Sequence, residues 1–331
     1  MMPSGAARTS SSAALRAGRS PLARAGERVI NGWIFVCGML SILFVLLIFV
    51  FVFREALPLL RQYPIAKLWG KEWVPVPPEG ETPDFGLIPL LLGSLQVTLG
   101  AIVLAVPLGL MTAVYIAEIA PPRLRDVLKP AIELLAAIPS VVLGFFGSVV
   151  LAGWLREGLH LSSGITMLGG SITLAFMAVP TIATISEDAI AAIPREIREG
   201  SYGLGATHWQ TIRRVLVPAA FSGIVAAVML GVGRAIGETM VVLMVTGNGV
   251  GLHQTALMNG PGNPVAAFQH FFGAYLELTR TLTATIASDM AEAVTGGAHY
   301  RALFLLGVVL FVITFLINLV ADWALARAKR I

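Results

Sequence analysis

Two ionisable residues, Arg234 and Glu238, stand inside an otherwise apolar stretch and are the strongest candidates for chemistry in this chain. An ionised side chain near the middle of a bilayer costs at least a few kcal/mol, so such residues usually face a bundle interior or an aqueous pathway. Because they are four residues apart, the two side chains would share one helical face and could pair. Arginine is always charged and forked, which suits a phosphate-like oxyanion. We expect Arg234 to attract a crossing anion and Glu238 to position or release it; the alternative is a structural ion pair that fixes helix packing.

A second polar segment, from Glu199 to Pro218, separates two apolar stretches and has little purpose unless another protein docks on it. Gly205 can adopt a left-handed turn. Thr207 and Gln210 have the Thr-x-x-Gln spacing of a capping box, which starts a helix. Pro218 is expected to open the next span, at a position where a missing N–H costs little. The segment is therefore predicted to form two short helices around a glycine turn.

Other chemistries lack the residues that they need. No G-x-x-x-x-G-K-[ST] phosphate loop occurs in the sequence, so ATP is expected to be handled by another chain. All five histidines fall outside the expected spans, which makes an ion-coupled secondary transporter a distant alternative. We expect neither a catalytic site nor a metal site. The single cysteine, Cys37, can form no intrachain disulfide.

The composition indicates a protein of the lipid bilayer. The chain is 56% hydrophobic and 13% charged, with a mean hydropathy of +0.81, whereas about a quarter of the residues of soluble proteins are charged. A helix needs about 20 mostly apolar residues to cross the hydrocarbon core. The sequence therefore predicts an all-α integral membrane protein with six transmembrane helices. They are expected at about Ile30–Phe53, Gly93–Ile116, Val127–Leu155, Ile165–Ile185, Val217–Val245 and Leu303–Leu325.

Two prolines inside the expected spans, Pro139 and Pro180, stand out. Pro139 and Pro180 would each remove one backbone hydrogen bond and kink a helix. Such kinks are common packing features of membrane helices, and in a transporter they can also be the places where helices pivot. The sequence leaves both interpretations open.

The distribution of basic residues predicts the orientation. With the N-terminus in the cytoplasm, fifteen Lys and Arg residues fall on the inner side and seven on the outer side. The positive-inside rule then places both termini, and the segment from Glu199 to Pro218, in the cytoplasm. These basic residues lie in short juxtamembrane segments, which favours membrane lipids over nucleic acid as their partner.

The segments outside the spans differ in character. Residues 1–29 are rich in Arg and Ser and are expected to form a flexible cytoplasmic tail. The outer loop 54–92 is rich in proline, which excludes long helix or sheet, and its Trp69 and Trp73 suit either a membrane interface or a partner contact. The long outer loop 247–300 either dips towards the membrane or forms small outer helices. Residues 187–216 are expected to form the cytoplasmic loop.

The segment from Glu199 to Pro218 resembles the EAA loop of ABC-importer permeases, a helix that sits in a cleft of the ATPase subunit. Gly200 and Ser201 depart from the usual alanines of that loop, and Val217 departs from the usual leucine. The glycine weakens the first helix by roughly 0.5–1 kcal/mol. On this resemblance, the residues expected to couple to an ATPase are Glu199, Gly200, Ser201, Gly205, Thr207, Val215 and Pro218.

Further segments narrow the resemblance. Residues 133–144, 234–239 and 281–286 resemble the permease subunits of the bacterial phosphate-specific ABC importer. In the outer loop, the patterns that start at Trp73 and at Phe85 favour the PstC-type subunit over its PstA-type sister. The resemblance runs from about Asn31 to the C-terminus. It implies the type I ABC-importer architecture in the bacterial inner membrane, with residues 93–326 as the permease core.

The resemblance also implies partners. Two homologous permeases, this chain and a PstA-type sister, would enclose a pathway for inorganic phosphate. Two ATPase subunits would bind the EAA loops and hold ATP and Mg, whereas this chain would bind no cofactor. A periplasmic phosphate-binding protein would deliver the substrate. Only the resemblance separates phosphate from molybdate, sulfate or phosphonate, so a permease for another oxyanion remains an alternative.

Overall fold

The structure, a computed structural model, describes residues 21–260 and 262–328. Its only sheet in these ranges is a pair of two-residue antiparallel strands, β1 (Trp73–Val74) and β2 (Asp84–Phe85). The helical elements are α2 (Pro21–Gln62), α3 (Ile65–Leu68), α4 (Ile88–Val114), η1 (Tyr115–Ile119), α5 (Pro122–Ala136), α6 (Ser140–Phe146), η2 (Gly147–Leu151), α7 (Ala152–Gly158), α8 (Met167–Ala191), α9 (Arg195–Gly203), α10 (His208–Thr211), η3 (Ile212–Leu216), α11 (Val217–Ala219), α12 (Phe221–Gly237), α13 (Met240–Val245), α14 (Leu252–Asn259), α15 (Pro264–Gly273), η4 (Ala274–Leu276), α16 (Leu282–Asp289) and α17 (Ala298–Ala328).

The number of long apolar helices agrees with the predicted all-α membrane protein. Five stretches are long and apolar enough to cross a membrane: Val29–Gln62, Ile88–Ile119, Ser140–Gly158, Met167–Ala191 and Ala298–Trp323. A sixth arises if two segments bent by 70°, His208–Ala219 and Phe221–Gly237, are taken as one span. The boundaries of several spans nevertheless differ from those expected.

The first helix is longer than predicted at both ends. α2 begins at Pro21, so residues 21–29 are helical and the prediction of a flexible tail is wrong for them; residues 1–20 of that tail lie outside the described residues. Proline is favoured in the first turn of a helix, and the Leu, Ala and Arg residues that follow are good helix formers. At its other end α2 continues through Pro58 to Gln62, so the proline-rich loop starts later than residue 54.

The span expected over Val127–Leu155 is broken. α5 ends at Ala136, and α6 begins at Ser140 after Pro139, which has extended backbone angles (φ −59°, ψ 136°). Pro139 therefore separates two helices and does not kink one, because proline disfavours the helical conformation of the residue before it. Pro180, in contrast, lies inside the uninterrupted helix α8.

The span expected over Val217–Val245 is also divided. α12 ends at Gly237, and α13 begins only at Met240. Pro218 lies in the three-residue helix α11, and the chain bends after Ala219. Pro218 thus stands in the first turn of a helix, as expected, but the predicted single span over Val217–Val245 is wrong.

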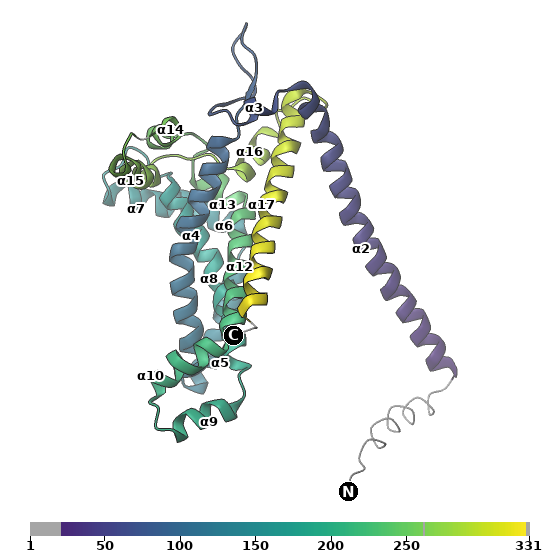
Figure 1. The fold of residues 1–331 in the computed structure, drawn as a ribbon, viewed down its shortest axis with the longest axis vertical. Helices are drawn as coiled ribbons and strands as arrows, with labels where there is room; N and C mark the ends of the chain where they lie inside the picture. Colours follow the sequence, from purple (N-terminus) through teal and green to yellow (C-terminus); the bar gives the residue numbers. More distant parts are fainter. Residues whose placement is uncertain (1–20, 261, 329–331) are drawn as a thin grey trace. The chain divides into compact units, whose positions relative to one another are not determined.

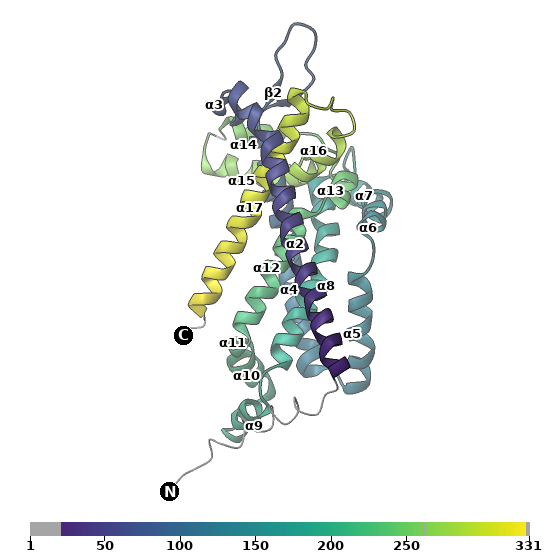
Figure 2. The same cartoon turned by 90° about the vertical axis from the view of Figure 1, so that its right-hand side faces the viewer.

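Within the part of the chain that starts at Glu55, four long helices define two opposite ends. Figures 1 and 2 show α4, α8, α12 and α17 side by side, with α9 and α10 at one end and α14 to α16 at the other. The segment 247–300 thus forms small outer helices, one of the two predicted alternatives.

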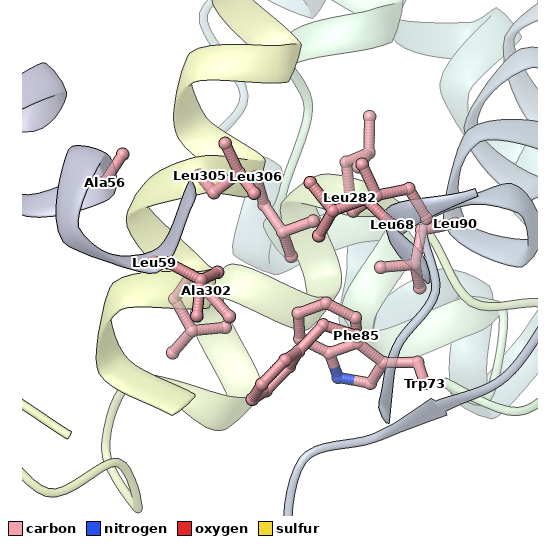
Figure 3. Close-up of a cluster of buried hydrophobic side chains, with 12 residues drawn as sticks. Ala56, Leu59, Leu68, Trp73, Phe85, Leu90, Leu282, Ala302, Leu305 and Leu306 are labelled. Carbon is pink, nitrogen blue, oxygen red and sulfur yellow. The ribbon is translucent and has the colours of Figure 1, made fainter. Parts of the chain in front are cut away.

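A hydrophobic cluster closes the outer end (Figure 3). Trp73 and Phe85, which face each other across the two-stranded sheet, lie edge to face at 5.7 Å. Trp73 is buried, and its indole N–H donates to the Asp289 carboxylate at 3.1 Å. Trp69 remains exposed. Of the two tryptophans expected at an interface or a partner contact, only Trp69 is therefore accessible.

Candidate functional site

The segment from Glu199 to Pro218 forms the helical hairpin that its sequence predicts. Gly205 adopts a left-handed conformation (φ +82°) between α9 and α10. The capping box is complete: the N–H of Gln210 donates to Thr207 Oγ1 at 3.3 Å, and the N–H of Thr207 donates to Gln210 Oε1 at 2.9 Å. We call the chain from Arg195 to Ala219 the coupling loop.

One side of the coupling loop packs against the rest of the protein. Ser201 is buried, and its hydroxyl hydrogen-bonds the buried Thr211 hydroxyl at 2.9 Å, which joins α9 to α10. Further along, Ile212 and Leu216 pack in a cluster with Ile190 at the end of α8. Ser201 departs from the usual alanine of an EAA loop, yet it makes a buried contact that alanine could not make.

Other side chains of the coupling loop are open to the surroundings. Leu204 is 92% exposed and Trp209 is 62% exposed. Glu199 and Gly200 are also exposed, as is Pro218, whereas Val215 is half-buried. Large apolar side chains that are exposed outside the apolar spans suit contact with another protein.

Arg198 anchors the coupling loop to two neighbouring elements. Its guanidinium donates to the carbonyl oxygens of Ile190 (2.8 Å) and Ile193 (2.9 Å) and to the carboxylate of Glu118 in η1 (2.9 Å). Sequence reasoning counted Arg198 only as an inner positive charge. Its position in the first turns of α9, just after an apolar helix, was the only signal of this role.

Arg234 lies near the end of α12 and reaches two neighbouring helices. Its Nη1 donates to Thr181 Oγ1 of α8 at 3.1 Å, and its Nη2 donates to the Ala136 carbonyl oxygen of α5 at 3.4 Å. The side chain is half-buried. Among the residues that the structure describes, no carboxylate lies within ion-pair distance of it. Its two hydrogen-bond partners are both neutral.

Glu238 does not pair with Arg234, so the predicted ion pair is wrong. The i,i+4 argument requires a continuous helix, but α12 ends at Gly237 and Glu238 is extended. The Glu238 carboxylate instead accepts the N–H groups at the start of the next helix: Thr239 and Met240 at 3.1 Å and Val241 at 3.5 Å. A carboxylate at a helix N-terminus is favourably placed.

Hydroxyl side chains surround Glu238. Ser94, Thr98, Thr281 and Thr283 line a cavity with it, and Thr283 Oγ1 donates to the Glu238 carbonyl oxygen at 2.8 Å. The cavity volume of about 10 Å³ is enough for roughly one water molecule. The cavity beside Glu238 is thus too small to hold an oxyanion in this structure.

A buried carboxylate at the cytoplasmic end of α8 was not singled out from the sequence. Glu187 is 1% exposed and accepts from Arg125 and Lys129 of α5, each at 2.5 Å. Lys129 also contacts Asp188 at 2.9 Å. The hydrogen bond to Glu187 raises the pKa of Lys129, so its ammonium group stays charged. These ion pairs tie α5 to α8.

Among residues 21–260 and 262–328, no three His, Cys, Asp or Glu side chains lie close enough together to hold a metal ion. The absence of a metal site stays a prediction.

Comparison with known proteins identifies the family. Residues 105–330 match the family described as "Binding-protein-dependent transport system inner membrane component". The "Probable ABC transporter permease protein YqgH" of Bacillus subtilis is 40% identical over 266 residues, which cover 80% of this chain and 79% of the relative. The "Phosphate transport system permease protein PstC" of Mesorhizobium japonicum is 34% identical over 287 residues, which cover 81% and 80%.

A solved structure supports the fold. The crystal structure of a bacterial ABC transporter involved in the import of the acidic polysaccharide alginate has a chain that matches with a TM-score of 0.60. The match covers 92% of this chain and 99% of the other at 14% identity, so it bears on architecture alone. Together with the five apolar spans, or six if the bent pair is taken as one span, it supports the predicted fold of a type I ABC-importer permease. The family match and the identity to the relatives show that this chain is a multi-pass inner-membrane component of the binding-protein-dependent ABC transport systems and belongs to the PstC-type permeases.

Proposed function

We propose that this chain is a permease subunit of an ATP-driven importer that moves inorganic phosphate across the bacterial inner membrane. Relatives from several bacteria that cover about four-fifths of its length are named phosphate transport system permeases, and they support this substrate. Membership of an ABC family argues against the ion-coupled secondary transporter that the sequence left as a distant alternative.

The observation that carries the proposal is the uncompensated charge of Arg234. A half-buried guanidinium in an apolar span is costly, and a purely structural role would favour a carboxylate beside it. The hydrogen-bond partners of Arg234 are instead a hydroxyl and a carbonyl group, from Thr181 and Ala136. A planar, permanently charged fork with neutral partners is well suited to receive a doubly or singly charged phosphate. Glu238 would then act at the closed cavity next to it.

The proposal includes the division of labour within an assembled importer. A homologous PstA-type permease would complete the pathway, and a periplasmic phosphate-binding protein would deliver the substrate at the outer end. Two ATPase subunits would hold ATP and Mg and dock on the coupling loops. The exposed Leu204 and Trp209 support such docking. This chain would contribute no ATPase site of its own.

The test is uptake of radiolabelled phosphate by the complete complex in proteoliposomes. A hydrogen bond to a charged group contributes about 1.5–3 kcal/mol. Arg234→Gln should therefore lower kcat/KM for phosphate uptake about 10- to 100-fold. Arg234→Lys keeps the charge but loses the fork, and it should retain part of the activity. Membrane abundance and ATPase association serve as controls for folding.

Competition by sulfate, molybdate and phosphonate decides the substrate. For a phosphate importer, none of the three should reduce phosphate uptake at equal concentration. Full uptake with Arg234→Gln would refute the proposed role of Arg234. A complex that prefers another oxyanion would refute phosphate as the substrate.

A further inference from the structure

Helix α5 is attached to its own chain in an unusual way. None of its side chains is buried. The half-buried ones, Arg125, Leu128, Lys129, Ile132 and Ala136, recur at the three- and four-residue spacing of one helical face. This inner face thus carries two cations as well as apolar groups. Hydrophobic burial alone does not fix α5 in place.

The apolar part of that face borders a groove. Leu128 and Ile132 line a space of about 690 Å³ together with α4, η1 and Trp209 of the coupling loop. Its wall is almost wholly apolar. The space is an open groove, because several of the side chains that line it, among them Met111, Ile119 and Trp209, are exposed. α5 therefore has room to shift relative to α4 without breaking a packed core.

Two polar clasps hold α5 against α8. The Glu187 clasp consists of Arg125, Lys129 and the buried Glu187. The Arg234 clasp, at the other end of α5, consists of Arg234, the Ala136 carbonyl group and the Thr181 hydroxyl group. Ala136 is the last residue of α5, so its carbonyl has no partner within the helix, and a cation is favourable there.

We propose that α5 is a gate helix and that the transported anion opens the Arg234 clasp. An oxyanion that binds the guanidinium competes with the neutral acceptors that now hold it, and a charged acceptor makes the stronger hydrogen bond. Capture of the anion by Arg234 would then release α5 at Ala136, and α5 would shift as one helix, which also separates Lys129 from α8 at the Glu187 clasp. Thr181 is a positioning residue in this scheme, because it holds Arg234 against Ala136. The inference rests on the proposed function, since it needs an anion at Arg234.

The first experiment locks α5 to α8. In the complete complex with Cys37→Ser, the pair Lys129→Cys/Asp188→Cys is joined by a short bifunctional thiol reagent. The wild-type side chains touch at 2.9 Å, so the two positions are within its reach. The matched control is Lys129→Cys/Glu133→Cys, which also loses Lys129 but links neighbouring turns of α5 only.

Relative to the same double variant before the reagent is added, locking should reduce phosphate uptake at least tenfold with the α5–α8 pair, and linking should not change it further with the control pair. Phosphate and ATP should also slow formation of the α5–α8 link severalfold. Phosphate uptake that continues in the locked complex would refute the proposal that α5 is a gate helix. If the wild-type complex, without the cysteine substitutions, imports no phosphate, the proposed function fails instead.

The second experiment tests Thr181 without a cross-link. Thr181→Val removes one acceptor of the Arg234 clasp with little change in volume, whereas Thr181→Ser keeps the hydroxyl group. Loss of a typical hydrogen bond changes an equilibrium constant about 2- to 10-fold. Thr181→Val should therefore raise the rate of phosphate-independent ATP hydrolysis by about that factor. Thr181→Ser should restore the wild-type rate. Equal rates in all three proteins, or a serine variant that behaves like valine, would contradict the role of Thr181.

Discussion

Replacement of Gly205 measures how much the turn of the coupling loop matters to the ATPase contact. The residue has φ +82°, and no atom lies within 4 Å of a Cβ built on it. The cost of a side chain is therefore conformational and not steric. For alanine we expect about 1–2 kcal/mol, because its Cβ crowds the carbonyl oxygen in the left-handed region. Asparagine tolerates this region better, so Gly205→Asn should be milder.

Gly200 offers a matched control in the same loop. It lies in α9, and a Cβ built on it likewise meets no atom within 4 Å. Gly200→Ala adds the same methyl group but in a helical conformation, where alanine is favoured over glycine by up to about 1 kcal/mol. The two substitutions should therefore change the stability of the loop in opposite directions.

The assay is titration of the ATPase subunit onto the permease complex in nanodiscs. The strained loop relaxes to another turn when free, and docking has to restore the original turn. The conformational cost of the turn therefore weakens binding of the ATPase subunit, and we expect binding to the Gly205→Ala complex to be about 5- to 30-fold weaker than to wild type. Gly200→Ala should bind as wild type or slightly more tightly. The reasoning fails if Gly205→Ala binds normally, or if the two alanine variants weaken binding equally.

Three further predictions concern other parts of the chain. Ser201→Ala leaves the buried Thr211 hydroxyl without its partner, so it should cost about 1–3 kcal/mol in thermal unfolding, and addition of Thr211→Val should recover most of that loss. Glu187→Gln should destabilise by at most about 3–5 kcal/mol, since its two cationic partners are more than a third exposed, whereas Asp188→Asn at the 62% exposed neighbour should change the melting temperature little. His208→Cys should react with an impermeant thiol reagent in inside-out vesicles only; labelling from the outer face would reverse the predicted orientation.

Local sequence determined the coupling loop well. The turn at Gly205 and the capping box of Thr207 and Gln210 form as predicted, because each involves residues no more than three positions apart. The number of spans and the membrane class were also predictable, since they depend on the length and hydropathy of continuous segments. The break at Pro139 had a local signal, the constraint of proline on the residue before it, but was interpreted as a kink.

The environment of Arg234 and Glu238 was decided by tertiary structure. From the sequence they are four residues apart in an apolar run, and pairing follows only if the helix continues. The helix stops because other contacts compensate for its end. The Glu238 carboxylate accepts three N–H groups at and just before the start of α13, and Thr283, forty-five positions away in the chain, donates to the Glu238 carbonyl oxygen. Arg234 likewise finds Thr181 and Ala136 on two other helices. The sequence alone determined which residues carry charge into the membrane; which groups those charges meet depends on contacts between distant segments, for which local periodicity holds no information.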